Sequence, residues 1–524
     1  MKISSIRFFI FFIVCLYPLI HRIQWNGDSV FVGSDPEIKL YQVEALRKDG
    51  SLLEKLQCYF PAKQLGFEVE RIPIGYPWAF QKQNGACYFQ YPILFALVQA
   101  SIGFLFPISW MTYIPILFFF LNLFLTDKLL RELGVKEKLS IPISLLIHFF
   151  SFLFLSTLDY SELTLTNFFA LLCLISYFQI EAKKESGLFY HLLFALSVNF
   201  NFQLRPEVTI GIVFFIIVHF VIVKEKWNWI RIHFLSGLVA IFVLGIISFI
   251  NYKLYGHIFG MRGMNTIQDV DTFSNRSYIG SWIADLWGSE SKIGIFKGYP
   301  IFFVFLSGLL LLKKKNIHSI SLFLSGLLFV FLVPILSPYR AGVDIFGMRY
   351  YEIGSYLTAI GFFSLYLESD RHKVIHSLLI LSILISSYFG YKSDLRAIRI
   401  WKSSAEMYHS LKKEIDTTKP KLVVHRGLAL SYLMGGTYLE IPQIAAYTEN
   451  DWDEIEKKSK SLGLDSILFL YWPGNSLYSE EIPKAIWKTQ FDLNWIPKGN
   501  LYMANKDMSV YHIQMKRFVL RSGK

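Results

Sequence analysis

Long apolar runs alternate along this chain with short polar segments that are rich in Lys and Arg. A helix that crosses the hydrocarbon core of a bilayer needs roughly 20 mostly apolar residues, and the chain contains about eleven such runs. Short basic loops stay on the inner side of a membrane. The pattern therefore predicts a mainly α membrane protein, a polytopic bundle of about eleven transmembrane helices.

The basic loops set the expected orientation. Candidate inner loops are 127–138, 181–185, 224–231, 313–315 and 368–373. With an inner N-terminus, alternation places these connections on the outer side: a large first loop (24–108), the turns at 159–162 and 205–207, the loops 253–298 and 338–349, and the tail. The first apolar run ends at His21-Arg22 without a small-residue cleavage site, so we interpret it as an uncleaved span.

One segment does not fit the alternation. Residues 91–108 are apolar enough for a span, but a span there would move the loop 127–138 to the outer side. The run is short and is bounded by Pro92 and Pro107. We therefore expect a helix that lies in the outer interface or re-enters the membrane, with a twelfth span as the alternative.

The composition changes near residue 391. We expect residues 1–391 to form the transmembrane domain and residues 392–524 a small, soluble C-terminal α/β domain on the outer face. Residues 452–463 have the pattern of an amphipathic helix, and residues 465–470 that of a buried strand. Residues 421–425 and 509–514 have strand-like patterns as well.

The charge and the cysteines add constraints. The net charge is +12, but the Lys and Arg residues are spread through short loops and form no basic stripe, so nucleic acid is not an expected partner. Cys15 and Cys173 lie inside apolar runs. Cys58 and Cys87 share the first loop and would form a disulfide if that loop faces an oxidising compartment.

Ionisable residues gather at the predicted outer membrane edge, where they are costly and therefore functional candidates. Asp35 and Glu37 open the first loop, and an amphipathic helix follows them. One interpretation is that Asp35 caps this helix, with Pro36 and Glu37 in the first turn. The other is that a carboxylate at this surface acts as a general base on a lipid-linked substrate.

The other charged candidates lie on the later outer turns. Glu162 either orients an acceptor or belongs to a solvated turn. Arg205 and Arg349 either hold a phosphate or pair with Glu207 and Glu352. Arg340 is a third candidate cation. The sequence shows no cluster of His, Cys or Asp residues with metal-ligand spacing.

The order of these segments resembles the GT-C glycosyltransferases, polytopic enzymes that take a sugar from a polyprenyl-phosphate carrier. Protein O-mannosyltransferases and the aminoarabinose transferases of lipid A are examples. The resemblance rests on an Asp in the first outer loop, on aromatic and Pro-rich segments of that loop, on an in-plane helix before the second span, and on the later polar turns. The segments that carry it are 75–78, 91–92, 161–162, 205–207, 251–256 and 346–350.

The resemblance implies an inverting glycosyl transfer on the periplasmic or outer face of the cell inner membrane. Asp35 matches the position of the catalytic acid. Pro36 departs from the usual pattern, which leaves open whether Asp35 or Glu37 is the base. The expected partners are a polyprenyl-phosphate sugar donor, a glycan, lipid or protein acceptor, and membrane lipids. The family includes members with and without a divalent metal, so no cofactor is assigned.

Three other functions fit parts of the same pattern. A transporter or flippase of lipid-linked saccharides would carry its polar groups near the middle of the membrane. A polymerase or ligase of surface polysaccharides would share the substrates and the large outer loop. An inactive relative with a scaffolding role would bind substrate without turning it over.

Overall fold

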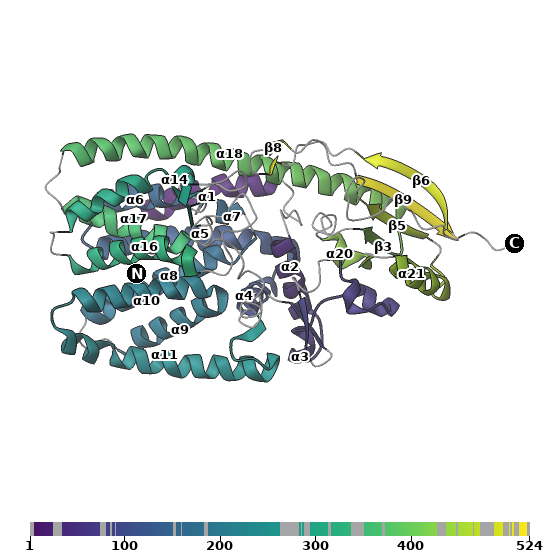
Figure 1. Cartoon of the computed structure of the whole chain (residues 1–524), viewed down its shortest axis with the longest axis horizontal. Helices are drawn as coiled ribbons and strands as arrows, with labels where there is room; N and C mark the ends of the chain where they lie inside the picture. The colour runs from purple at the N-terminus through teal and green to yellow at the C-terminus, as the bar shows by residue number, and fades with distance from the viewer. Residues whose placement is uncertain are drawn as a thin grey trace.

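The computed structural model describes residues 5–24, 34–73, 80–83, 86–89, 91–149, 154–158, 160–182, 187–261, 282–283, 286–287, 294–312, 316–336, 351–368, 373–426, 436–446, 449–464, 466–471, 487–495, 502–503, 506–507 and 513–520. A helical bundle forms one end of the molecule and a β-sheet the other, as Figure 1 shows. Helices α2, α3 and α4 lie between them.

The bundle consists of apolar helices that lie side by side. Its longer described members are α1 (Ser5–Gln24), α5 (Ile114–Glu132), α6 (Glu137–Phe149), α8 (Leu163–Ala182), α9 (Leu188–Leu204), α10 (Pro206–Ile222), α11 (Lys226–Tyr255), α16 (Ile317–Leu336) and α17 (Glu352–Glu368). Short helical segments complete it: α7 (Leu155–Leu158), α14 (Ile295–Gly298), α15 (Phe302–Leu306) and η4 (Ser307–Leu311). The structure is mostly helical, as expected.

Four helices within the described ranges are long and apolar enough to cross a membrane. They are Ser5–Gln24, Trp110–Glu132, Leu163–Ala182 and Lys226–Tyr255. Helices α9, α10 and α16 are also apolar but contain shorter qualifying stretches. The prediction of a polytopic membrane protein is therefore supported, while the number eleven stays a prediction.

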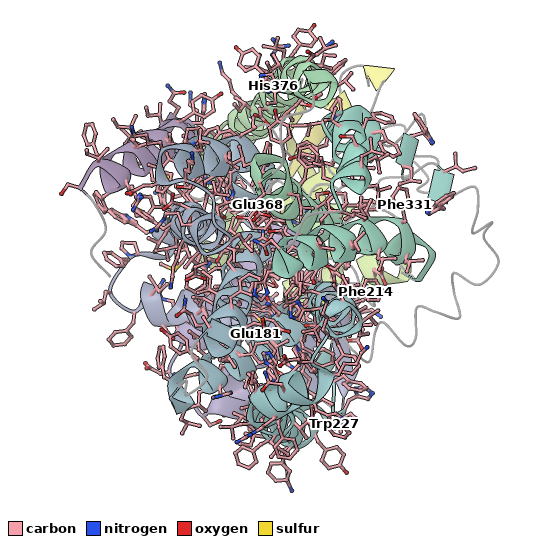
Figure 2. All side chains as sticks on the ribbon, turned by 90° about the vertical axis from the view of Figure 1, so that its left-hand side faces the viewer. Glu181, Phe214, Trp227, Phe331, Glu368 and His376 are labelled. Carbon is pink, nitrogen blue, oxygen red and sulfur yellow. A yellow bond between two sulfur atoms is a disulfide. The ribbon has the colours of Figure 1, made fainter. Side chains whose placement is uncertain are left out.

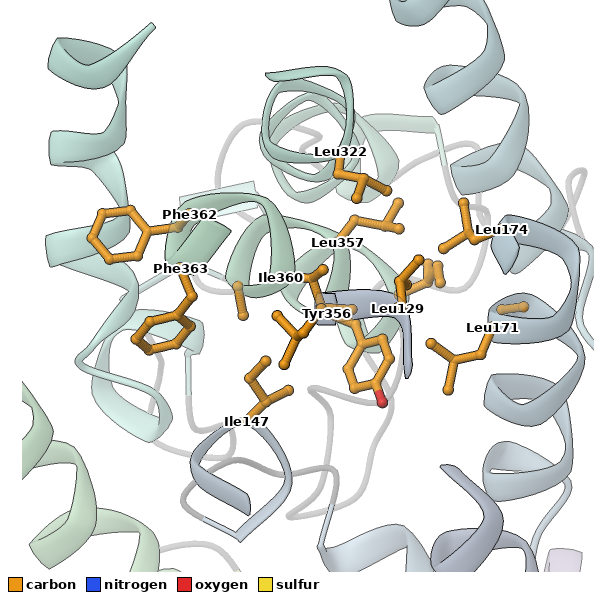
Figure 3. Close-up of a cluster of buried hydrophobic side chains, with 14 of the residues drawn as sticks. Leu129, Ile147, Leu171, Leu174, Leu322, Tyr356, Leu357, Ile360, Phe362 and Phe363 are labelled. Atoms are coloured by element: carbon orange, nitrogen blue, oxygen red, sulfur yellow. The ribbon is translucent and has the colours of Figure 1, made fainter. Parts of the chain in front are cut away.

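The core of the bundle is a continuous apolar cluster contributed by α5, α6, α8, α16 and α17, shown in Figure 3. Leu129, Leu171, Leu322 and Leu357 in this cluster are fully buried. Helices α16 and α17 approach closely because Gly326 lacks a side chain, and a Cβ atom there would collide with the backbone of α17. Small residues permit such close packing of helices in membranes.

The first loop folds into short elements between the bundle and the sheet (Figure 1). They are α2 (Ser34–Arg47), α3 (Leu52–Lys55), η1 (Pro61–Leu65), η2 (Val69–Arg71), β1 (Phe80–Gln83), β2 (Ala86–Phe89), α4 (Ile93–Gly103) and η3 (Ile108–Tyr113). Cys58 and Cys87 form the expected disulfide. The 11 residues of α4 extend only about 16 Å at the helical rise of 1.5 Å per residue. That length supports an interfacial or re-entrant helix rather than a twelfth span.

The sheet is mixed. Strand β3 (Val423–Arg426) pairs in parallel with β4 (Gln443–Ala445) and β5 (Ser466–Tyr471), and β9 (Ile513–Leu520) pairs antiparallel with β5 and β6 (Trp487–Trp495). The strand order is β4-β3-β5-β9-β6. The remaining elements are α20 (Thr437–Glu440), α21 (Glu449–Ser461), β7 (Tyr502–Met503) and β8 (Lys506–Asp507).

The elements expected in the tail agree with these to different degrees. Helix α21 and strands β3 and β5 overlap the predicted segments 452–463, 421–425 and 465–470. Of the predicted strand 509–514, residues 509–512 lie outside the described part of the chain, and Ile513 and Gln514 belong to β9.

The expected domain boundary at 391/392 does not coincide with an interruption of the chain. Helix α18 (Lys373–Thr418) continues without a break through this point for 46 residues, about 69 Å at the helical rise. It runs along the bundle and on to the sheet (Figure 1). The composition changes inside one helix, because its first part packs beside the bundle and its second part extends beyond it.

The first loop and the sheet share one apolar core. Ile38 and Tyr41 of α2 are buried together with Val424 of β3 and Tyr438 of α20. The Tyr41 and Tyr438 rings lie 4.2 Å apart, and the Tyr438 hydroxyl donates to the Tyr59 carbonyl at 3.0 Å. Because α2 also contacts the bundle, this core connects the sheet to the polar residues at the helix ends.

Salt bridges join the same two parts at their surface. The Arg71 guanidinium contacts the carboxylates of Asp451 at 2.5 Å and Glu454 at 2.6 Å. Burial opposes the charge of Arg71, but these two acids raise the pKa of its guanidinium. Arg71 therefore stays charged and ties the first loop to α21.

Described residues in or next to four of the predicted inner loops meet at the other end of the bundle. Gln179 donates to Glu132 at 2.9 Å, and Asn316 donates to the Leu133 carbonyl at 3.1 Å and to Glu368 at 2.8 Å. We call this the loop end of the bundle, and the end that faces α2 and the sheet the sheet end. Alternation of the spans predicted that these loops lie on one side of the membrane. Their meeting at one end of the bundle agrees with that prediction.

Candidate active site

The junction of α9 and α10 places two charged residues at the sheet end. Arg205 is extended (φ −151°, ψ 96°), as expected for a residue that precedes a proline, and Pro206 starts α10. Glu207 lies in the first turn of α10, where the helix dipole favours a carboxylate. The Arg205 guanidinium binds the Glu207 carboxylate through Nε at 2.6 Å and Nη2 at 2.5 Å.

Glu162 lies at the start of α8. Its carbonyl accepts the first hydrogen bond of that helix from the Thr166 amide at 2.8 Å. Its carboxylate is almost completely buried and lies 3.8 Å from Nη1 of Arg205. The structure thus brings together Glu162, Arg205 and Glu207, three candidates from two separate turns of the sequence.

Lys39 of α2 completes this group, although it is not among the site residues predicted from the sequence. Its ammonium lies 2.5 Å from Oε2 of Glu162, with both side chains buried, and 5.2 Å from the centre of the Tyr91 ring. The available signal was a lysine within an otherwise apolar run, Ile38-Lys39-Leu40. Only the tertiary structure shows that a carboxylate on α8 compensates its charge.

Asp35 and Glu37 both lie in α2. The helix begins at Ser34, so Asp35 lies inside its first turn rather than at the cap. Glu37 is fully buried. Burial raises the pKa of the Tyr41 hydroxyl well above its usual value, and the charge of Glu37 one turn away raises it further.

The two acids occupy different positions around α2. Residues four apart on a helix share a face, whereas residues two apart do not. Asp35 precedes Lys39 by one turn, and Lys39 contacts Glu162. Glu37 lies beside Tyr41, which packs against Tyr438 of the sheet. Asp35 therefore lies one turn before the residue of α2 that contacts Glu162, whereas Glu37 lies one turn before Tyr41.

A third buried cation lies at the same end of the bundle. Arg22, near the end of α1, is only 2% exposed. Burial raises the pKa of the Tyr160 hydroxyl, and the nearby Arg22 charge lowers it in part. Because Tyr160 comes two residues before Glu162, this interaction places a further positive charge near the cluster. In the sequence, Arg22 marks only the end of the first span.

Several predicted site residues lie outside the described part of the chain. They are Arg340, Arg349, Asp159 and the side chain of Asp35. Glu352, the expected partner of Arg349, is buried at the start of α17, where it accepts a hydrogen bond from Asn167 at 3.3 Å. Glu352 therefore interacts with α8.

Lys39, Glu162, Arg205 and Glu207 form what we call the charged cluster. Two cations and two carboxylates lie within ion-pair distance at the ends of apolar helices. Burying such charges is costly unless they are paired. The pairing holds the two cations in fixed positions.

Comparison with solved structures shows the same architecture. The crystal structure of ArnT from Cupriavidus metallidurans in the apo state matches with a TM-score of 0.51 and 9% identity, over 97% of each chain. The chain therefore shares the fold of this ArnT structure. The Archaeoglobus fulgidus oligosaccharyltransferase, in its complex with Zn and sulfate, matches with a TM-score of 0.50 and 12% identity. That match covers 88% of this chain and 67% of the other.

The GT-C resemblance expected from the sequence is therefore confirmed at the level of the fold, and with it the placement in a membrane. The sequence matches no family model and no curated protein. The sequence identities to these two structures are only 9% and 12%, so the similarity lies in the arrangement of the helices.

Proposed function

We propose that this protein is a membrane glycosyltransferase that moves a sugar from a polyprenyl-phosphate carrier to a glycan, lipid or protein acceptor. The observation that carries the proposal is the charged cluster, which lies at the sheet end of a GT-C bundle next to the helix that contains Asp35. The shared fold with glycosyltransferases supports a transfer reaction, and the buried cations support a phosphate-bearing donor.

In the proposed reaction a carboxylate removes the proton from an acceptor hydroxyl. The acceptor oxygen forms a bond to C1 of the sugar from the side opposite the carrier, so the configuration at C1 inverts. The bond between C1 and the carrier oxygen breaks, and polyprenyl phosphate leaves with the electron pair. A phosphate leaving group needs no general acid, so one base and cationic stabilisation are sufficient.

Asp35 is the preferred base and Glu37 the alternative. The helical register supports this order, because Asp35 lies one turn from Lys39 while Glu37 is buried beside Tyr41. Lys39 and Arg205 would stabilise the departing phosphate. Glu162 and Glu207 would hold these two cations in position, and Glu162 would also orient the acceptor. Arg340 and Arg349 remain further proposed contacts to the donor.

A divalent metal in this cluster finds little support among the described side chains. Lys39 and Arg205 already compensate Glu162, and Glu207 accepts two bonds from Arg205. A metal ion prefers carboxylates without such cationic neighbours. We therefore assign no metal to the described part of this site and route no step through one.

We propose that the reaction takes place on the periplasmic face of the inner membrane. The Cys58–Cys87 disulfide in the first loop supports this side, because disulfides persist in oxidising compartments. About eleven spans, with residues 24–108 and 392–524 outside, fit this orientation. The packing of the sheet on the first loop supports a role for residues 392–524 next to the site, for which we propose acceptor recognition.

The position of the charges favours a transferase over a transporter or flippase. A transporter is expected to bind its substrate near the middle of the membrane. Glu162 begins α8 and Arg205 precedes α10, so the charged cluster lies at helix ends. A polymerase or ligase of lipid-linked saccharides uses the same site chemistry and differs in its acceptor.

The test is a transfer assay with the purified full chain, polyprenyl-phosphate-linked sugars as donors, and peptide, glycan and lipid acceptors. The readout is release of polyprenyl phosphate. We expect Asp35→Asn to abolish release and to leave the protein folded. Asp49→Asn, an exposed acid just beyond α2, is the matched control and should keep wild-type rates.

Normal turnover by Asp35→Asn would reassign the base, and Glu37→Gln would then be the next variant. Absence of release by the wild type with every donor, together with movement of the intact donor across vesicle membranes, would overturn the proposal in favour of a flippase.

A further inference from the structure

A second group of ionisable side chains lies at the loop end of the bundle. Glu181 of α8, His219 of α10 and His318 of α16 present one carboxylate oxygen and two ring nitrogens within 4.8 Å of one another. Figure 2, which looks onto the loop end, shows Glu181 among the helix ends. We propose that these three residues bind a transition-metal ion of the zinc class.

The site is separate from the charged cluster. Glu181 lies 19 positions after Glu162 near the end of α8, about 28 Å along the helix. His219 lies 14 positions after Arg205 near the end of α10, about 21 Å away by the same rise. The proposed metal therefore takes no part in glycosyl transfer, and this inference does not depend on the proposed function.

The two distances from Glu181 to the histidines are close to the ligand spacing of tetrahedral coordination, and the whole set lies within 4.8 Å. Oε1 of Glu181 lies 3.1 Å from Nε2 of His219, and Oε2 lies 3.4 Å from Nδ1 of His318. Ligand atoms bound to zinc at about 2.0–2.1 Å in tetrahedral geometry lie about 3.3 Å apart. An ion could therefore bind with only small movements of these side chains.

The hydrogen bonds around His219 leave its Nε2 atom available to bind a metal ion. The Ser321 hydroxyl donates its proton to the Ile317 carbonyl at 2.7 Å, so its oxygen accepts from Nδ1 of His219 at 3.0 Å. The lone pair of neutral His219 then lies on Nε2, which faces Glu181. A ligating histidine commonly donates its other ring proton to such a neighbour, which fixes the orientation of the ring.

His318 offers a buried ring nitrogen to this group. Its Nδ1 atom is buried and makes no hydrogen bond within the described structure, although it lies beside Glu181. Buried polar atoms are nearly always satisfied. The rest of the His318 side chain is 35% exposed, which provides a path for an ion from the surface.

His233 of α11 supports the site from the side. Its Nε2 atom lies 3.1 Å from Oε1 of Glu181, and its ring stacks on Tyr177 at 4.3 Å. The rings of His219 and His318 are parallel, with centres 5.1 Å apart. Imidazole ligands with a single carboxylate suit zinc and its neighbours better than magnesium or calcium. A bound ion would cross-link α8, α10 and α16.

The experiment uses the full chain, purified in detergent with an affinity tag that contains no histidine. After treatment with a chelator, the protein is incubated with Zn²⁺, freed of excess ion, and analysed for zinc by mass spectrometry. We expect about one zinc per chain for the wild type, as a single site of three protein ligands predicts. We expect at least a tenfold loss for His219→Ala and for His318→Ala. Co²⁺ should give the visible absorption of a tetrahedral site in the wild type only.

The matched control is His191→Ala. His191 is a buried histidine of α9 that pairs with Ser236 at 2.7 Å and is not one of the three proposed ligands. It should retain wild-type zinc. Equal zinc in the wild type and both ligand variants, or none in the wild type, would overturn the proposal.

A second measurement covers variants that fail to fold. Zn²⁺ should raise the thermal unfolding midpoint of the chelator-treated wild type, and Mg²⁺ should not. The milder substitution Glu181→Gln should remove this shift. The same midpoint with and without Zn²⁺ for the wild type would contradict a site that ties three helices together.

Discussion

The ion pair between Lys39 and Glu162 joins the first loop to the bundle at 2.5 Å. Both side chains are almost fully buried, so neither charge is well solvated. Removing one partner of such a pair leaves the other charge uncompensated, which typically costs about 3–5 kcal/mol. The pair therefore helps to position α2, the helix that contains Asp35, against the start of α8.

We predict that Lys39→Met lowers the free energy of unfolding by about 3–5 kcal/mol. The double variant Lys39→Met/Glu162→Gln should recover a large part of this loss, because it removes both charges. Denaturant unfolding in detergent measures both effects. Lys48→Met is the control, since Lys48 is half exposed in its pair with Glu44 and should cost less than about 1 kcal/mol.

A second prediction concerns Arg205. Losing a charge-assisted phosphate contact costs about 1.5–3 kcal/mol, so Arg205→Ala should raise the KM for the donor roughly 10- to 150-fold. The KM of Arg205→Lys should lie between those of the wild type and Arg205→Ala, because lysine keeps the charge but lacks the planar group that binds an oxyanion through two bonds. Arg47→Ala, an exposed arginine of α2, is the control. An unchanged KM would assign Arg205 to structure alone.

At the scale of elements, strand β3 carries a buried titratable group within the sheet. His425 is fully buried and contacts Oε1 of Gln443 on β4 at 2.8 Å. Burial lowers the pKa of His425 to about 4, and the bond to Gln443 opposes this in part. The ordinary pKa of a histidine is about 6.5, so the folded sheet excludes a proton that the unfolded chain accepts.

The buried His425 makes the stability of the folded protein depend on pH. Between pH of about 6.5 and about 4 the unfolded state binds one more proton than the folded state, so stability falls as the pH is lowered. The loss from this group amounts to roughly 3 kcal/mol at the lower limit. We expect the thermal midpoint to fall between pH 7.5 and 5, and the fall to be smaller for His425→Gln. His409→Gln, a histidine on α18, should leave the profile unchanged.

At the scale of the whole molecule, the apolar core shared by α2 and the sheet couples distant parts of the chain. Tyr438 is 1% exposed and packs on Tyr41, although almost 400 positions separate them along the sequence. Residues 392–524 therefore stabilise the helix that contains the proposed base.

We predict that Tyr438→Ala destabilises the shared core by about 3–5 kcal/mol, as is typical when a large buried aromatic side chain is replaced by alanine. Hydrogen exchange measured by mass spectrometry should show faster exchange in α2 as well as in the sheet. Tyr388→Ala is the control, because Tyr388 lies on α18 and is 61% exposed. Faster exchange confined to the sheet would show that α2 does not depend on this contact.

Local sequence patterns were enough to predict the class of fold and to place the polar turns on one side of the membrane. Apolar runs of membrane length and the basic loops between them are local properties, because the bilayer imposes a length on each helix and the charge of short loops sets its direction. The alternation of spans is therefore sufficient to group the turn with Glu162 and the turn with Arg205 and Glu207 on one side. The shared loop of Cys58 and Cys87 allowed a disulfide only if it faces an oxidising compartment, and the structure forms the bond.

Which charged side chains contact one another became clear from the packing of the helices. Lys39 pairs with Glu162, more than 120 positions away, and Glu181 meets His219 and His318 from three separate helices. The tertiary structure also showed that the sheet packs on the first loop and that α18 crosses the expected domain boundary. Such pairings depend on how helices rotate and pack against one another, and no spacing within one segment encodes that rotation.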